Sequence, residues 1–174
     1  MSIDALTPGH TDALVRFFAE LPSGDLTFVK DDVTATAVRA WIREGGLRWV
    51  ATDADTVTGY AAVRPLTGWS DHVAEIRLVV RPDRRGTGLG RALAQRALAE
   101  SHDAGMRKIV VELVAEQEHA IAMFASLGFV GEALLRDHIR DREGELRDLV
   151  MLAHHVDTTW SVMESVGLAD ELQD

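Results

Sequence analysis

The chain of 174 residues contains no cysteine, only four prolines and a single tyrosine. Without cysteine there can be no disulfide, no thiolate zinc site and no cysteine nucleophile. No run in the sequence approaches the roughly 18 apolar residues that a membrane-spanning helix requires. The first residues also lack the basic flank and apolar segment of a secretory signal. These absences predict a cytoplasmic protein that does not enter a membrane.

The net charge and the spacing of the histidines argue against two further kinds of binding partner, nucleic acids and metal ions. The net charge of −10 argues against nucleic-acid binding, which normally depends on Lys and Arg neutralising phosphates. None of the seven histidines is spaced with carboxylates as a chelating group, so we expect no metal site. Residues 157–174 carry five acidic side chains and no Lys or Arg, which is half of the net charge.

Hydrophobic periodicity divides the chain into alternating strands and helices of one α+β domain. We expect this domain over residues 1–155 and a separate acidic tail over residues 156–174. In the tail, Trp160, Met163, Val166 and Leu168 stand at near-helical spacing, which predicts a short helix that docks on its own chain or across a homodimer seam. The predicted strands are 3–6, 47–52, 57–64, 73–81, 108–114, 133–141 and 146–154, and the predicted helices of the domain are 11–21, 33–43, 91–102 and 118–127.

A glycine-rich loop at residues 85–90, Arg-Gly-Thr-Gly-Leu-Gly, follows a strand and opens a helix. The first amides of a helix have no partner within it and lie at the positive end of its dipole, so they attract phosphate. Arg91 stands where a dinucleotide-binding fingerprint needs its third glycine, and no Gly-Lys-Ser/Thr occurs, so neither common nucleotide loop fits. The loop therefore predicts a pyrophosphate cradle of another kind, the alternative being a plain tight turn.

The spacing of Arg85, Gly88 and Gly90 resembles the acetyl-CoA signature of the GCN5-related N-acetyltransferases, the GNAT superfamily. The preceding Val-Val-Arg-Pro at 79–82 and the later Leu-Gly-Phe at 127–129 also resemble that family, as does the order of elements over residues 1–155. The resemblance implies a three-layer fold, a mixed and mostly antiparallel sheet flanked by helices. Its two central parallel strands, here 73–81 and 108–114, would splay apart to admit coenzyme A.

The same resemblance implies a chemistry in which an acceptor amine attacks acetyl-CoA directly in a ternary complex. Ala74-Glu75-Ile76 resembles the Ala-Glu-Ile of the histone acetyltransferase branch, which makes Glu75 the candidate general base; otherwise Glu75 is a surface residue paired with Arg77 or a neighbouring strand. The residues that the resemblance assigns to the cofactor are Leu78, Val79, Val80, Arg85, Gly86, Thr87, Gly88, Leu89, Gly90, Arg91, Gln117 and Phe124.

Two positions depart from the family pattern. Phe124 stands where many members have a tyrosine that protonates the leaving thiolate, and Gln117 stands where an asparagine often contacts the cofactor. The leading hypothesis is an acetyl-CoA-dependent N-acetyltransferase acting on a primary amine, whether a small molecule, an amino acid or a protein amine. The alternative, motivated by Phe124, is a regulatory module that binds coenzyme A without turnover.

Overall fold

The computed structural model of this chain describes residues 2–156, and the predicted tail helix and dimer seam lie outside them. A seven-stranded sheet in the order β1-β2-β3-β4-β5-β7-β6 runs through the molecule. Every neighbouring pair is antiparallel except β4 and β5, which confirms the predicted mixed sheet. The strands are β1 (Ser2–Ala5), β2 (Leu47–Asp53), β3 (Thr56–Pro65), β4 (Val73–Val80), β5 (Lys108–Val114), β6 (Val130–Arg140) and β7 (Leu146–His155).

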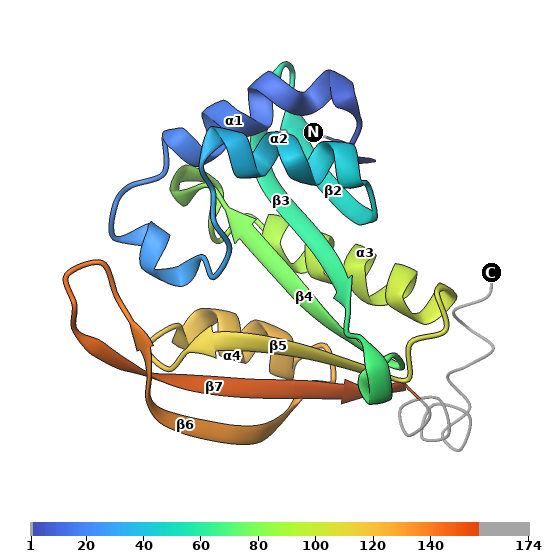
Figure 1. The fold of residues 1–174 in the computed structure, drawn as a ribbon, viewed down its shortest axis with the longest axis vertical. Coiled ribbons are helices and arrows are strands. Elements are labelled where there is room, and N and C mark those ends of the chain that lie inside the picture. Colours follow the sequence, from blue (N-terminus) through green and yellow to red (C-terminus); the bar gives the residue numbers. More distant parts are fainter. Residues whose placement is uncertain (1, 157–174) are drawn as a thin grey trace.

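Helices cover both faces of this sheet, as Figure 1 shows. On one face, α1 (Thr11–Ala19) and α2 (Ala35–Glu44) pack their buried side chains against β2 and β3. On the other, α3 (Leu89–Asp103) and α4 (Glu118–Ala125) form a larger core with the central strands. This confirms the predicted three-layer arrangement. Four short 3₁₀ turns, which the sequence did not predict, are η1 (Pro8–His10), η2 (Asp25–Phe28), η3 (Gly68–Ser70) and η4 (Pro82–Arg84).

The two parallel strands at the centre separate after only three paired residues. Val73, Ala74 and Glu75 of β4 lie opposite Lys108, Ile109 and Val110 of β5, and no later residue of β4 pairs with β5. From there to Val80, β4 keeps only β3 as a strand partner among the described residues. The labelled arrows of β4 and β5 diverge in Figure 1. The splayed central strands expected from the resemblance are therefore present.

Alternation along β4 decides which side chains reach each face of the sheet, because successive residues of a strand point to opposite sides. Ala74, Ile76 and Val80 pack into the core beneath α3. Glu75 and Arg77 consequently point to the face that carries α1 and α2. Neither belongs to the aromatic core that these two helices form; Glu75 is buried and Arg77 is largely buried.

Candidate active site

The glycine loop has free amide groups at the start of α3. Gly86 and Gly88 take positive φ angles of 73° and 88°, and Gly88 is the N-cap of the helix in a left-handed conformation. Within residues 2–156, none of the amides from Gly86 to Arg91 donates to a backbone carbonyl. An added Cβ at Gly88 would meet nothing within 4 Å. The loop thus presents unpaired donors at the positive end of a 15-residue helix, as a pyrophosphate site requires.

The loop is held in place by its own side chains and by distant segments. Thr87 Oγ1 donates to the carbonyl of Arg84 at 2.7 Å. The Arg85 guanidinium donates to the carbonyl of Val80 at 3.3 Å and to Asp25 Oδ1 at 3.1 Å. Arg91 reaches Ser126 Oγ at 2.5 Å. These bonds fix the loop against β4, η2 and the end of α4.

Glu75 is the last residue of β4 that pairs with β5, and it is 6% exposed. It is therefore not a surface residue, although the alternative expectation of a pair with Arg77 is met, because Arg77 Nη1 donates to Glu75 Oε1. Burial raises the pKa of Glu75 above its ordinary value of 4.5, and the nearby charge of Glu112 also raises it, against the opposing charges of Arg77 and Lys30. A carboxylate with a raised pKa beside a cleft suits a general base.

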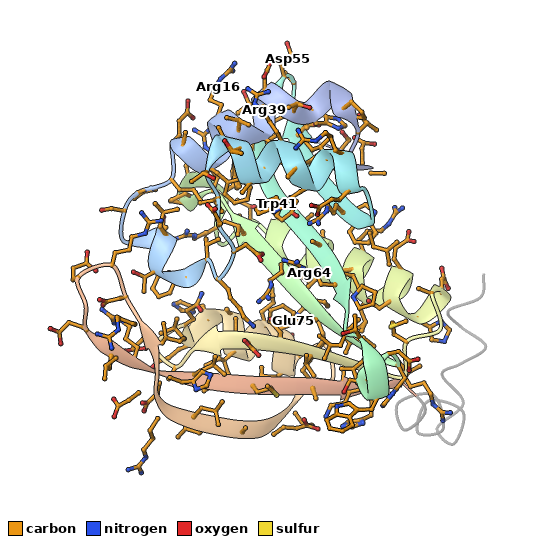
Figure 2. The ribbon with its side chains drawn as sticks, in the orientation of Figure 1. Arg16, Arg39, Trp41, Asp55, Arg64 and Glu75 are labelled. Carbon is orange, nitrogen blue, oxygen red and sulfur yellow. The ribbon has the colours of Figure 1, made fainter. Side chains whose placement is uncertain are left out.

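Lys30 and Asp31, from the segment between η2 and α2, reach the same region. Lys30 Nζ lies 3.3 Å from Glu75 Oε1 and 2.5 Å from Glu112 Oε2. Asp31 Oδ1 accepts a hydrogen bond of 2.7 Å from Arg64 Nη1. Figure 2 labels Arg64 and Glu75, which face each other as cross-strand partners on β3 and β4. Oppositely charged groups thus alternate over this part of the sheet.

A pocket of about 460 Å³ is lined in part by two of these charged residues, Arg64 and Glu75. Charged side chains of β3 and β4 and residues of the chain between these two strands line it. Trp69 of η3 lies in the chain between the lining residues Thr67 and Ser70 and is 97% exposed. The lining residues are Arg64, Pro65, Leu66, Thr67, Ser70, Glu75 and Arg77.

The remaining residues assigned to the cofactor lie around the opening between β4 and β5. Leu78, Val79 and Val80 follow Glu75 on β4 and pair with β3 alone. Gln117 is the N-cap of α4, and its Oε1 accepts a hydrogen bond of 2.9 Å from the amide of Val114, at the end of β5. Its side-chain carbonyl therefore holds the diverging strand to the following helix.

Neither Phe124, at the position of the family's tyrosine, nor Tyr60, the single tyrosine of the sequence, can protonate the leaving thiolate. Phe124 is 2% exposed, and its ring packs edge-on against Phe129 at 5.1 Å between centroids. Tyr60 is also 2% exposed, stacks on Trp41, and accepts a 2.7 Å hydrogen bond from Arg48. Burial raises the pKa of Tyr60, with Arg48 acting in the opposite direction. Tyr60 is therefore a core residue.

Over residues 2–156, no group of three or more His, Asp or Glu side chains is arranged to hold a metal ion. None of the described helices combines the length and the apolar character needed to cross a membrane.

The sequence matches the model of the Acetyltransferase (GNAT) family over residues 15–129. That range covers more than half of the chain, and it includes the second half of α1, all of α2, the glycine loop and the Leu-Gly-Phe segment. The chain therefore belongs to the GNAT acetyltransferase family, which confirms the resemblance seen in its motifs.

Curated relatives and solved structures agree with this family. The chain is 31% identical over 111 residues to the L-amino acid N-acyltransferase MnaT of Escherichia coli (strain K12), covering 62% of this chain and 63% of MnaT. It is 32% identical over 141 residues to the mycothiol acetyltransferase of Amycolatopsis mediterranei (strain U-32), covering 74% of this chain and 46% of that protein. The chain thus spans less than two thirds of the length of each of these relatives.

Among solved structures, the GCN5-related N-acetyltransferase from Kribbella flavida superimposes with a TM-score of 0.76 at 26% identity, covering 88% of this chain and 96% of the other. The yncA structure from Salmonella typhimurium was solved with its cofactor acetyl-CoA. It superimposes with a TM-score of 0.78 at 22% identity, covering 89% of this chain and 93% of the other. These likenesses confirm the predicted fold class.

Several charged residues of the site were not found from the sequence. Glu75 and the loop were predicted from local motifs. Lys30, Asp31, Arg64 and Glu112 come from three other segments and belong to no motif. Only the sheet register, which places Arg64 opposite Glu75, and the placement of the segment after η2 bring them together.

Proposed function

We propose that this protein is an N-acetyltransferase that moves an acetyl group from acetyl-CoA to a primary amine. One observation carries the proposal: the buried carboxylate of Glu75 stands where β4 and β5 part. An amine in the pocket above Glu75 would face a cofactor lying between the diverging strands. The glycine loop at the start of α3 would hold its pyrophosphate through the amides of residues 86–91.

Acetyl-CoA supplies an activated acetyl thioester. The acceptor nitrogen attacks the carbonyl carbon, so a C–N bond forms as the C–S bond breaks. Glu75 accepts the proton lost by the amine, directly or through a water molecule. A main-chain N–H near Leu78 or Val79 would stabilise the developing oxyanion. With Phe124 and Tyr60 both buried, water is the proposed proton source for the departing thiolate, whose reference thiol pKa is about 8.5.

A thiol-release assay tests this proposal. Purified protein is mixed with acetyl-CoA and a panel of small amines, amino acids and peptides, and free coenzyme A is measured together with the acetylated product. We expect release that depends on the amine. Binding of acetyl-CoA by calorimetry, with no release on any acceptor, would instead favour the non-catalytic module that the missing tyrosine at Phe124 suggests.

We further propose a cytoplasmic location and, through the tail, a homodimer. The absence of cysteine from the sequence supports the location, because cysteine-poor chains do not depend on an oxidising compartment, and cell fractionation tests it. The apolar spacing of Trp160, Met163, Val166 and Leu168 supports the dimer seam. Deleting residues 158–174 and measuring mass in solution tests it, and an unchanged dimer would contradict a role for the tail.

A further inference from the structure

The segment between η2 and α2 places two adjacent, oppositely charged residues, Lys30 and Asp31, in ion pairs with charged side chains of β3, β4 and β5. Lys30 bridges two carboxylates on neighbouring strands, at 3.3 Å from Glu75 and 2.5 Å from Glu112. Its own side chain remains 51% exposed, whereas those of the two glutamates are 8% and 19% exposed. The two carboxylates are thus largely buried on β4 and β5, whereas the ammonium group comes from a half-exposed side chain outside the sheet.

Asp31 makes the complementary contact with two guanidinium groups. Its Oδ1 accepts from Arg64 at 2.7 Å, and its Oδ2 lies 3.4 Å from Nε of Arg77. That second contact is an ion pair without a hydrogen bond, because Arg77 Nε is buried and has no hydrogen-bond partner among the described residues. Arg64 and Arg77 thus share the carboxylate of Asp31, and the N–H of Arg77 Nε makes no hydrogen bond among the described residues. A buried donor without a partner costs free energy.

The two halves of this arrangement adjoin one another. Arg77 contacts Glu75 through Nη1 and approaches Asp31 through Nε. Its guanidinium group therefore lies between Glu75, which holds the ammonium of Lys30, and the carboxylate of Asp31. Arg64, Glu75 and Arg77 also line the pocket. Without Lys30 and Asp31, two carboxylates and two guanidinium groups would remain, a neutral set in which Glu112 and Arg64 would each have lost the ion pair described here.

We propose that Lys30 and Asp31 are internal stand-ins for the ammonium and carboxylate of a zwitterionic acceptor, so that the preferred substrates are free α-amino acids. The acceptor displaces Lys30 from Glu75 and Glu112, and its carboxylate replaces that of Asp31 on the arginines. Its amine then lies on the carboxylate proposed as base. This inference rests on the proposed acetyl transfer, and it names the acceptor class for the same site.

Matched acceptors test the inference. Each of several L-amino acids is compared with its α-amide, which keeps the amine and side chain and lacks the carboxylate. Arg64→Gln removes a half-exposed guanidinium, and it should raise KM about tenfold for the acids, the size expected for one charge-assisted bond. The KM for the amides should remain within about twofold on the same reasoning. Arg39→Gln, on α2 and similarly exposed (labelled in Figure 2), is the control and should change neither.

Substitutions of the two stand-in residues should lower KM, the opposite of the effect of Arg64→Gln. Asp31→Asn should lower KM for the acids alone, because it frees the arginines, whereas Lys30→Met should lower KM for acids and amides alike. The inference is wrong if Asp31→Asn raises KM as Arg64→Gln does, since Asp31 would then be part of the binding wall. It is also wrong if Arg64→Gln affects acid and amide equally.

The same experiment separates this inference from the function on which it rests. Acetylation of the amides with no preference for the acids would leave the proposed transferase intact and overturn the acceptor class. If no amine releases coenzyme A, the transferase proposal fails. Calorimetry with coenzyme A-saturated protein then decides the inference: amino acids should bind and Arg64→Gln should weaken them, and absence of binding would refute it.

Discussion

Replacing Gly88 by alanine tests the glycine loop without adding a steric clash within the protein. Gly88 has a φ of 88°, and a Cβ there would meet no atom within 4 Å. Gly144, in the turn between β6 and β7, has a φ of 92° and equally open surroundings. The two substitutions therefore impose the same kind of backbone cost, and only one lies at the proposed phosphate site.

The expected losses in Tm and in affinity can be worked out from the backbone conformation of the two glycines. A left-handed conformation costs an L-residue roughly 1–2 kcal/mol. At about 2–4 °C per kcal/mol for a chain of this size, each variant should lose roughly 2–8 °C in Tm. The strain introduced by Gly88→Ala should also shift the adjoining backbone, and turning even one amide away from the phosphates should lower acetyl-CoA affinity about 10- to 100-fold. Gly144→Ala should retain the affinity.

Differential scanning fluorimetry measures the first quantity, and isothermal titration calorimetry with acetyl-CoA measures the second. The expected result is a similar Tm loss in both variants and an affinity loss in Gly88→Ala alone. Equal affinities in the two variants would refute the reasoning that the amides at the start of α3 bind the pyrophosphate.

Two further predictions concern the scaffold. An added Cβ at Gly59 would lie 2.7 Å from Leu93 Cδ1, in a core where Leu93 is fully buried. Gly59→Ala should therefore lower the free energy of unfolding, measured with urea, by about 1–3 kcal/mol. Gly131→Ala, on β6 with open space around it, is the control and should be neutral or slightly stabilising. Burial raises the pKa of Asp141, but the hydrogen bond from Arg147 and two backbone amides outweigh it, so that pKa is lowered. A carboxyl group whose pKa is lowered by folding stabilises the fold at pH values above its ordinary pKa of 3.8, and this stabilisation is lost as the pH falls through the lowered pKa. Asp141→Asn should therefore unfold more easily than wild type at pH 7. The difference between the two proteins should shrink as the pH falls toward 2. A difference that grows with acidity would contradict this.

The fold was largely predictable because its elements repeat strong local patterns. The strand predicted over 108–114 coincides with β5 (Lys108–Val114). Errors fall where the pattern carries little information. The helix predicted from residue 91 begins at Leu89, because Gly88 caps it and a glycine-rich start has no hydrophobic period. Likewise β6 begins at Val130, three residues earlier than predicted, because its exposed, irregularly paired first residues do not alternate.

The site was predictable only where one segment carries it. The motif around Glu75 and the spacing of residues 85–90 predicted two positions that the fold brings to the opening between β4 and β5. The sequence could not reveal that Glu75 is buried under Lys30, because that contact joins residues 45 positions apart. Nor could the sequence show whether Glu75 and Arg77 form a pair on the surface or part of a buried network of charges, since that depends on which segment covers β4.

The pH dependence of kcat/KM for wild type and Glu75→Gln tests the central claim most directly. Since only the deprotonated base is active and its pKa is raised above 4.5, wild-type activity should be lost as the pH falls through that raised value. Glu75→Gln should be slower by about 10²- to 10⁴-fold and should lack this acid limb. Glu100→Gln, a carboxylate on α3 paired with Arg96, is the matched control and should behave as wild type. Retention of both the rate and the acid limb in Glu75→Gln, with unchanged folding, would contradict the account.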